Sequence, residues 1–88
     1  MNQDDVKVSF YLKKSEANEL GECPIMGRLN VGRYSEAAFS MKMTAPESTW
    51  LLGRATGKSV RSREINRQLD EVRASIFSIY QDLFALRE

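Results

Sequence analysis

The stretch of the chain that decides the fold is residues 59–87, which read SVRSREINRQLDEVRASIFSIYQDLFALR. Large apolar residues recur in it at steps of three and four, the spacing of one face of an α-helix. They are Ile65, Leu69, Val72, Ile76, Ile79, Tyr80, Leu83 and Leu86. Ser59 or Ser62 is placed to cap the start of this helix. A helix over about 59–87 is ~40 Å long, more than a short sheet covers, so we expect its far end to overhang.

The residues before the helix predict three β-strands, at about 6–14, 23–31 and 34–43. The first shows the clearest alternation of apolar and polar residues, a period of two that indicates a half-buried strand. Gly32 permits the positive φ of a tight turn between the second and third strands. Irregular alternation just after this turn, over 34–37, predicts a bulge there.

The same alternation sorts the strand residues into two faces. The face expected to pack on the core holds Val6, Val8, Phe10, Leu12, Cys23, Ile25, Gly27, Leu29, Val31, Phe39, Met41 and Met43. The segments at 14–22, 44–49 and 53–58 are rich in turn formers and are predicted to be loops, with Trp50 covering one end of the core. The expected fold is α+β, a three-stranded antiparallel sheet in the order 1-2-3 packed against one long C-terminal helix.

Length and composition limit what the chain can be. Its 88 residues fit a single domain, and 42% hydrophobic with 28% charged residues is typical of a folded protein. Apolar runs last two or three residues, far short of the roughly 20 that span a membrane. The polar, acidic start does not resemble a secretory signal. We therefore expect a cytoplasmic protein with no membrane contact.

Residue types that carry most enzyme chemistry are scarce. The chain has no histidine and one cysteine, Cys23, so an intrachain disulfide, the usual zinc sites and every Ser-His or Cys-His nucleophile are excluded. The segment from Gly53 to Ser59 has three residues between its glycines, where a phosphate-binding P-loop needs four. We expect no catalytic residue, metal, cofactor or small-molecule substrate.

The outer face of the predicted sheet is the candidate binding surface. The net charge of the chain is only +1, so local segregation of charge has to carry any argument for nucleic acid. The residues expected on this face all form hydrogen bonds and none is acidic: Lys7, Ser9, Tyr11, Lys13, Arg28, Asn30, Ser40 and Lys42. A second basic cluster surrounds the helix start, with Lys58, Arg61, Arg63 and Arg67. For Arg28 the alternative is a surface ion pair with Glu36 on the neighbouring strand.

These residues, in this order, resemble the N-terminal arm-type DNA-binding domain of tyrosine recombinases, the integrases of conjugative transposons and phages. The likeness rests on short segments along nearly the whole chain: Val8 to Lys13, Gly21 to Ile25, Arg28-Leu29, Met41-Lys42-Met43, Pro46 with Trp50, Gly57-Lys58-Ser59, Glu64-Ile65-Asn66, and Leu69-Asp70-Glu71. One departure concerns the third strand. The family usually has a Ser-Thr-Gly step before an Ile-Lys-Val segment, whereas here Phe39-Ser40 leads directly into Met41, so the register of that strand is open.

The resemblance implies accessory binding to arm-type DNA sites, with catalysis in other domains of the recombinase. The chain is then a single domain, 1–88, from a longer integrase, and its partners are double-stranded DNA, the remaining integrase domains and other protomers. The sheet face would enter the major groove. Lys7, Lys13, Lys42, Lys58 and Arg61 would contact phosphates, while Tyr11, Arg28 and Asn30 would reach base edges.

Two other functions fit parts of the sequence. Double-stranded RNA-binding modules also back a three-stranded sheet with a helix, but only five residues precede Val6, where such a module needs a further helix. The other candidate is a protein-interaction domain that docks through Ile79, Leu83, Phe84 and Leu86 at the end of the helix. Binding to duplex DNA but not to double-stranded RNA would exclude the RNA-binding module. Binding to neither nucleic acid would favour the protein-interaction domain.

Overall fold

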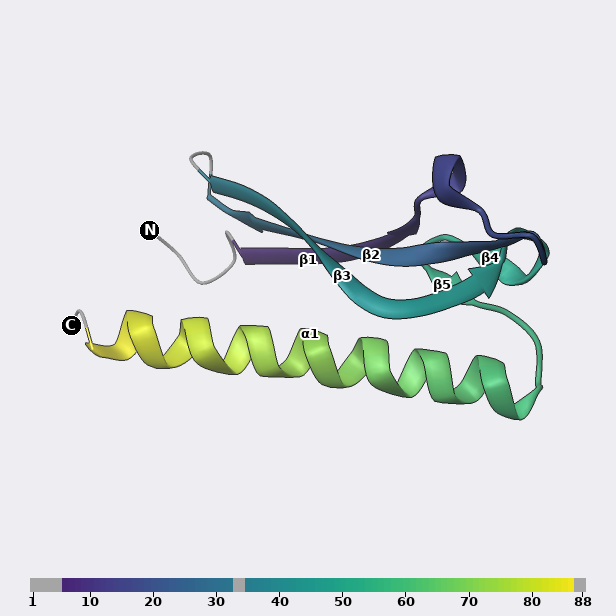
Figure 1. Cartoon of the computed structure of the whole chain (residues 1–88). Coiled ribbons are helices and arrows are strands. Elements are labelled where there is room, and N and C mark those ends of the chain that lie inside the picture. The colour runs from purple at the N-terminus through teal and green to yellow at the C-terminus, as the bar shows by residue number, and fades with distance from the viewer. Residues whose placement is uncertain (1–5, 33–34, 87–88) are drawn as a thin grey trace.

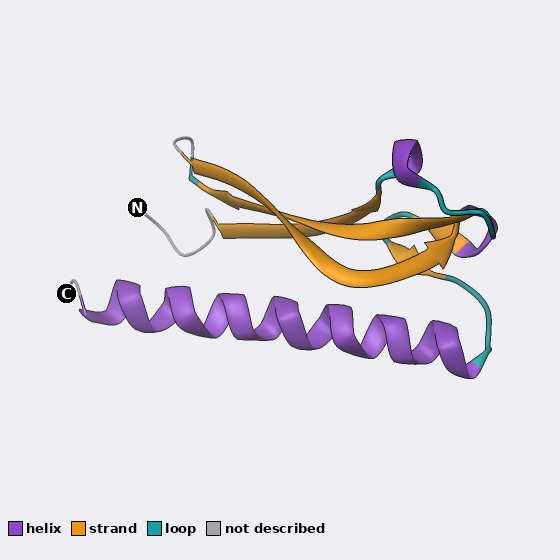
Figure 2. Cartoon of the chain, viewed as in Figure 1, coloured by secondary structure: helices purple, strands orange, loops and turns teal. Residues whose placement is uncertain are grey.

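The computed structural model describes residues 6–32 and 35–86. Strands β1 (Val6–Leu12), β2 (Glu22–Val31) and β3 (Ser35–Pro46) form an antiparallel sheet in the order β1-β2-β3, and the helix α1 (Val60–Leu86) runs along one side of it (Figures 1 and 2). Short 3₁₀ turns, η2 (Lys14–Glu16) and η3 (Glu47–Thr49), follow β1 and β3. The predicted α+β class, strand order and long C-terminal helix are confirmed.

The third strand differs most from its predicted form. It extends to Pro46, so the loop expected from residue 44 begins later. Pairing with β2 is regular from Ser35 to Ser40, and the irregularity lies opposite the step from Pro24 to Met26, where β3 carries two extra residues. The bulge predicted at 34–37 is therefore misplaced; residues 33–34, on which part of the predicted turn falls, lie outside the described residues.

A second, two-stranded sheet was not predicted. β4 (Trp50–Leu51) and β5 (Arg54–Ala55) form a hairpin in the segment expected to be mostly loop. Its two turn residues, Leu52 and Gly53, both have positive φ, 51° and 82°. Gly53 lies close to β1, because a Cβ built on it would stand 3.2 Å from the carbonyl oxygen of Phe10. The hairpin thus covers part of the open edge of the main sheet.

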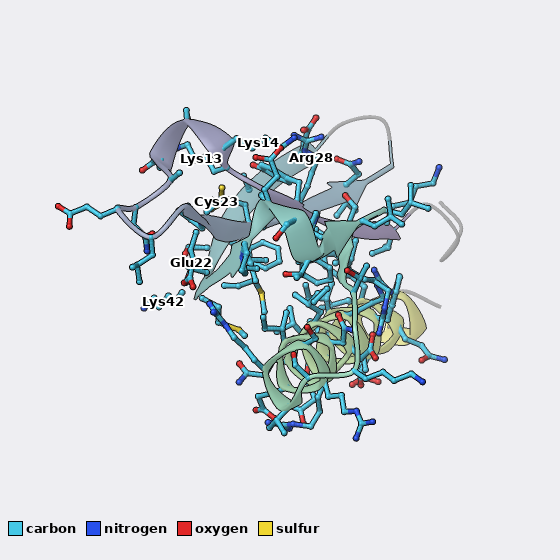
Figure 3. All side chains as sticks on the ribbon, turned by 90° about the vertical axis from the view of Figure 1, so that its right-hand side faces the viewer. Lys13, Lys14, Glu22, Cys23, Arg28 and Lys42 are labelled. Carbon is cyan, nitrogen blue, oxygen red and sulfur yellow. The ribbon has the colours of Figure 1, made fainter. Side chains whose placement is uncertain are left out.

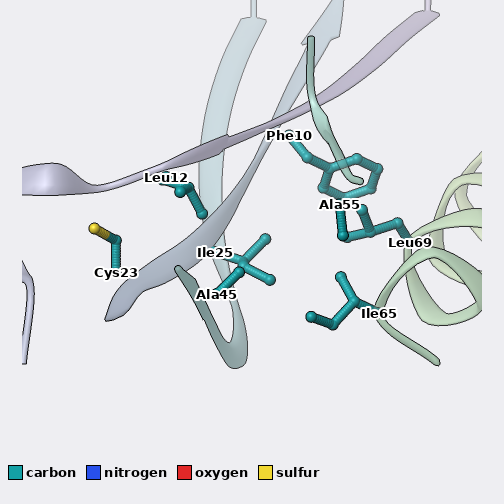
Figure 4. Packing of buried hydrophobic residues seen from close by; sticks show 8 residues of the cluster. All are labelled: Phe10, Leu12, Cys23, Ile25, Ala45, Ala55, Ile65 and Leu69. Atoms are coloured by element: carbon teal, nitrogen blue, oxygen red, sulfur yellow. The ribbon is translucent and has the colours of Figure 1, made fainter. Parts of the chain in front are cut away.

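The core lies between the sheet and the first half of α1. Its buried residues come from β1, β2, β3, β5 and the helix, and Figure 4 shows eight of them: Phe10, Leu12, Cys23, Ile25, Ala45, Ala55, Ile65 and Leu69. Ile25 and Leu69 are 0% and 1% exposed. Phe39, Met41, Met43 and Trp50 pack against this cluster. The predicted core face is confirmed on all three strands, and Cys23 is a buried free thiol.

Polar contacts fasten the start of α1 to the hairpin. The hydroxyl oxygen of Ser59 accepts the backbone N–H of Ser62 at 3.0 Å, which makes Ser59 the N-cap. The side chain of Asn66 accepts the N–H of Ala55 at 3.0 Å and donates to its carbonyl at 2.9 Å, pairing with β5 as a strand would. Arg54 donates two hydrogen bonds to Asp70, at 2.9 and 3.2 Å.

The second half of α1 leaves part of its apolar surface open. Phe77, Ile79 and Leu83 are 40%, 58% and 49% exposed, whereas Val72 packs on the core. The predicted overhang is therefore present in the described part of the helix. Within the described residues no helix is long and apolar enough to cross a membrane.

Candidate nucleic-acid interface

Strand register places the candidate residues in rows across the face of the sheet that is remote from α1. Directly opposite residues of antiparallel strands share a face. One row holds Lys7, Asn30 and Glu36, the next Ser9, Arg28 and Ala38, and a third Tyr11, Met26 and Ser40. The structure therefore brings Lys7, Tyr11, Arg28 and Asn30 together on one surface, as predicted.

Arg28 stands near the centre of this face, on the middle strand. Its guanidinium carbon lies 4.8 Å from the centroid of the Tyr11 ring, within the range of a cation–π contact. Its Nε lies 3.2 Å from a carboxylate oxygen of Glu36, on β3. The ion pair considered as the alternative for Arg28 is thus formed, with both side chains about half exposed or more, 47% and 65%.

Glu36 corrects the expectation of a face without acids. Glu36 lies just after the turn, where alternation is irregular, so the sequence did not predict which face of the sheet it occupies. The register of the β2–β3 hairpin could have predicted its position. Because Val31 pairs with Ser35, Glu36 lies opposite Asn30 on the outer face. The face is positive, but less strongly so than the alternation predicted.

Two lysines at the end of β1 also carry acidic neighbours. Lys13 pairs with Glu16 and Lys14 pairs with Glu47, all four side chains being well exposed. The hydrogen bond and charge of Glu16 raise the pKa of Lys13 above its usual value, so Lys13 stays charged at neutral pH. Figure 3 shows Lys13, Lys14 and Arg28 on the same side of the sheet, away from the helix. Exposed pairs of this kind are weak and exchange readily for other anions.

Lys42 occupies the irregular part of β3. Its φ is +58°, which is unusual for a lysine, and its backbone N–H donates to the hydroxyl of Ser40 at 3.0 Å. The side chain is exposed and projects from the β3 edge, apart from Lys13 and Arg28 (Figure 3). Among the residues that the structure describes, neither Lys42 nor Lys7 forms an ion pair.

Two of the four cations in the basic cluster at the helix start are neutralised within the protein. Arg61 donates two hydrogen bonds of 2.8 Å to Glu22 and one of 3.0 Å to the carbonyl of Thr44. Arg67 pairs with Glu64 and Glu71 on the helix itself. Lys58 and Arg63 are exposed and have no ion pair among residues 6–32 and 35–86. The structure thus separates Arg61 from the sheet face and leaves Lys58 accessible beside the helix start.

Hydrogen bonds from Arg61 and Thr44 hold the pKa of Glu22 at about 2, below its ordinary value of 4.5. This contact ties α1 to the start of β2 and the end of β3. Arg54 likewise lowers the pKa of Asp70. Arg61 therefore links the helix to the main sheet and Arg54 links it to the β4–β5 hairpin.

Comparison with known families identifies the family of the chain. Residues 10–87 match a family model described as an arm DNA-binding domain. The chain belongs to this family. No curated protein and no solved structure matched it. The family assignment makes the chain a DNA-binding domain with double-stranded DNA as its partner.

The two faces of this arm DNA-binding domain differ in chemistry. The helix covers one face of the main sheet with apolar contacts, while the other carries cations, hydroxyls, an amide, the partly buried Tyr11 ring and the Glu36 carboxylate. Cations and hydroxyls bind phosphate oxygens, whereas arginine and asparagine match the acceptor and donor pattern of purine edges. The outer face therefore has the groups needed for both backbone and base contacts.

Proposed function

We propose that this arm DNA-binding domain is the accessory, non-catalytic part of a tyrosine recombinase, an integrase of a mobile element, and that it binds arm-type sites through the outer sheet face. The observation that carries the proposal is the position of Arg28. It lies on the central strand of the face that the helix leaves open, with Lys7, Tyr11 and Asn30 on the same face.

The dimensions of the sheet suit the major groove. Neighbouring strands lie about 4.8 Å apart, so three strands span roughly 10 Å between the outer backbones, and the major groove of B-DNA is about 12 Å wide. Side chains of the central strand reach deepest in such a placement. Arg28 and Asn30, with Tyr11 beside them, then face base edges.

Lysines around the rim of the face meet the phosphates in this arrangement. Lys7 on β1 and Lys13 just after β1 flank it, Lys42 projects from the β3 edge, and Lys58 precedes the helix. Arg61 is left out of the proposed interface because Glu22 and Thr44 engage both of its amino groups. Its proposed part is structural, holding α1 against the sheet.

Titration of labelled duplexes tests the proposal. The probes are duplexes that cover the attachment region of the parent element, a scrambled duplex and double-stranded RNA of equal length. We expect an attachment-region duplex to bind tightest and RNA weakest. Four phosphate contacts should give log affinity a slope of about −3.6 against log salt. Equal affinity for all three probes, or preference for RNA, contradicts the proposal.

We further propose that the exposed apolar side of α1 contacts the remaining domains of the recombinase. Ile79 and Leu83, four residues apart, lie on this side in the half of the helix beyond the core, and Phe77 is exposed on the other flank. Leu83→Glu should leave the melting temperature and DNA affinity of the domain unchanged but reduce recombination by the full-length protein. Unchanged recombination contradicts this assignment.

A further inference from the structure

Three side chains form a diagonal line across the outer sheet face. Arg28, on the central strand, lies directly opposite Ser9 on β1 and Ala38 on β3. These small neighbours leave room for the arginine to make its contacts diagonally, with Tyr11 on one side and Glu36 on the other. Each outer strand thus supplies one group that holds the guanidinium of the middle strand.

The two contacts restrain the guanidinium in different ways. The Tyr11 ring, 4.8 Å from the guanidinium carbon, offers a face for the planar group to stack on. The Glu36 carboxylate, 3.2 Å from Nε, attracts the guanidinium from the β3 side as an ion pair. Because the carboxylate meets the Nε side, the N–H groups of the two Nη atoms remain the arginine's further donors.

A carboxylate on a DNA-binding face has an electrostatic cost that calls for a compensating role. Glu36 is 65% exposed as a side chain and lies in the row of Lys7 and Asn30. Its charge repels phosphates and the acceptor atoms of the groove, which weakens binding to every duplex. Only a duplex that an oriented Arg28 contacts gains affinity that offsets this repulsion.

We propose that Glu36 is a positioning and selectivity residue, which holds the Arg28 guanidinium against Tyr11 for a two-bond contact with guanine and penalises duplexes that lack that guanine. This inference rests on the proposed function of the sheet face, and in it Glu36 makes DNA binding by that face selective. Guanine offers O6 and N7 as paired acceptors, and an arginine held in one plane loses less freedom on binding them.

The test compares affinities for two duplexes. One is a sequence selected by the wild-type domain from a randomised 20-base-pair pool, and the other is its scrambled version. We expect Glu36→Ala to weaken binding to the selected duplex and to strengthen binding to the scrambled one, so that their affinity ratio falls about 5- to 30-fold. Glu36→Gln, which keeps an oxygen acceptor for Nε, should recover part of the ratio.

An Arg28→Ala background provides the matched control. There Glu36→Ala has nothing to position, so it should strengthen binding to both duplexes by the same factor. Equal gains, equal losses or no change in the wild-type background overturn the inference, as does a further fall of the ratio in the Arg28→Ala background. Failure of the wild-type domain to bind duplex DNA overturns the proposed function instead. Melting curves of each variant confirm that the exposed substitutions leave the fold intact.

Discussion

At the scale of single residues, the account depends most on Arg28. Its stacking on Tyr11 and its pairing with Glu36 leave it exposed and oriented, not buried in a structural network. A surface ion pair contributes little to stability. The contacts of Arg28 therefore add little to stability and leave its exposed side chain accessible to a ligand.

Arg28→Ala should cost about 1 to 3 kcal/mol of binding free energy on a selected duplex and leave affinity for scrambled DNA nearly unchanged, because base contacts carry sequence information. Arg28→Lys should recover little, since lysine lacks the planar fork. Fluorescence anisotropy titration measures both. Full rescue by lysine would show that Arg28 supplies only charge.

At Lys42 a positive charge can be removed by a substitution that suits the local backbone conformation. Its φ of +58° is a conformation that glycine adopts more readily than lysine. Lys42→Gly should therefore leave the melting temperature unchanged or higher, while weakening binding to all duplexes equally and reducing the salt slope by about 0.9. Arg67→Gln, a loss of charge on the solvent side of α1, is the matched control and should leave the slope unchanged. A slope unaltered by Lys42→Gly contradicts the phosphate contact.

The Phe39 ring packs directly over Gly27 on the core face of the sheet. A Cβ at this position would lie 2.1 Å from the tip of the Phe39 ring, so the ring occupies the space that any larger residue needs. Gly27→Ala should destabilise the domain by about 1 to 3 kcal/mol through overpacking, as measured by urea denaturation. The same substitution in a Phe39→Leu background should cost less, and an equal cost would show that the ring is not the obstacle.

At the scale of elements, α1 is held by its apolar first half and by polar contacts at its start. Leu69→Ala, at a fully enclosed site, should cost about 2 to 5 kcal/mol of unfolding free energy, which in a domain of this size approaches the whole stability. A denaturation midpoint close to that of the wild type would show that the helix does not depend on this contact.

The pair of Glu22 and Arg61 predicts how helix attachment depends on pH. The pKa of Glu22 in the folded state is about 2, below its ordinary value of 4.5, so the stability it contributes is present above about pH 4.5 and is lost as the pH falls toward 2. Melting temperatures measured from pH 6 to pH 2.5 should fall, and Glu22→Gln should make the fall smaller. An identical fall in the variant contradicts the assignment to Glu22.

The sequence was most informative where a period extends over many residues. Alternation in β1 and β2 gave the correct core and outer faces, and the three-to-four spacing placed α1 within a residue of its start. The β4–β5 hairpin was missed because two-residue strands have no period, and its turn, Leu52-Gly53, lacks the usual Asn-Gly signal. The position of the bulge depends on pairing with β2, which local sequence does not encode.

Candidate site residues were predictable to the extent that alternation determines their face. Tyr11, Lys13, Arg28 and Asn30 fell on the expected side. The partners of the cations were harder to predict, because Glu22 and Arg61 meet only when the helix docks and Glu36 meets Arg28 only through the hairpin register. The long-range pair with Glu22 therefore engages Arg61 within the protein, and the hairpin register adds an acid, Glu36, to the outer face.

At the scale of the whole molecule, the domain presents two surfaces with different chemistry. The outer sheet face carries Lys7, Arg28, Asn30 and Tyr11, while the far half of α1 carries exposed apolar residues. The core lies between the sheet and the first half of the helix. One surface then suits DNA and the other a protein neighbour, and the small core only has to hold them in fixed relation.

Amide chemical shifts of the ¹⁵N-labelled domain, recorded during titration with a selected duplex, test the central claim most directly. The account predicts that the largest changes fall on Lys7, Tyr11, Arg28 and Asn30 of the outer sheet face and on Lys42 at the β3 edge, and that Phe77, Ile79 and Leu83 change little. Changes concentrated on the exposed side of α1, with the sheet face unaffected, would contradict it.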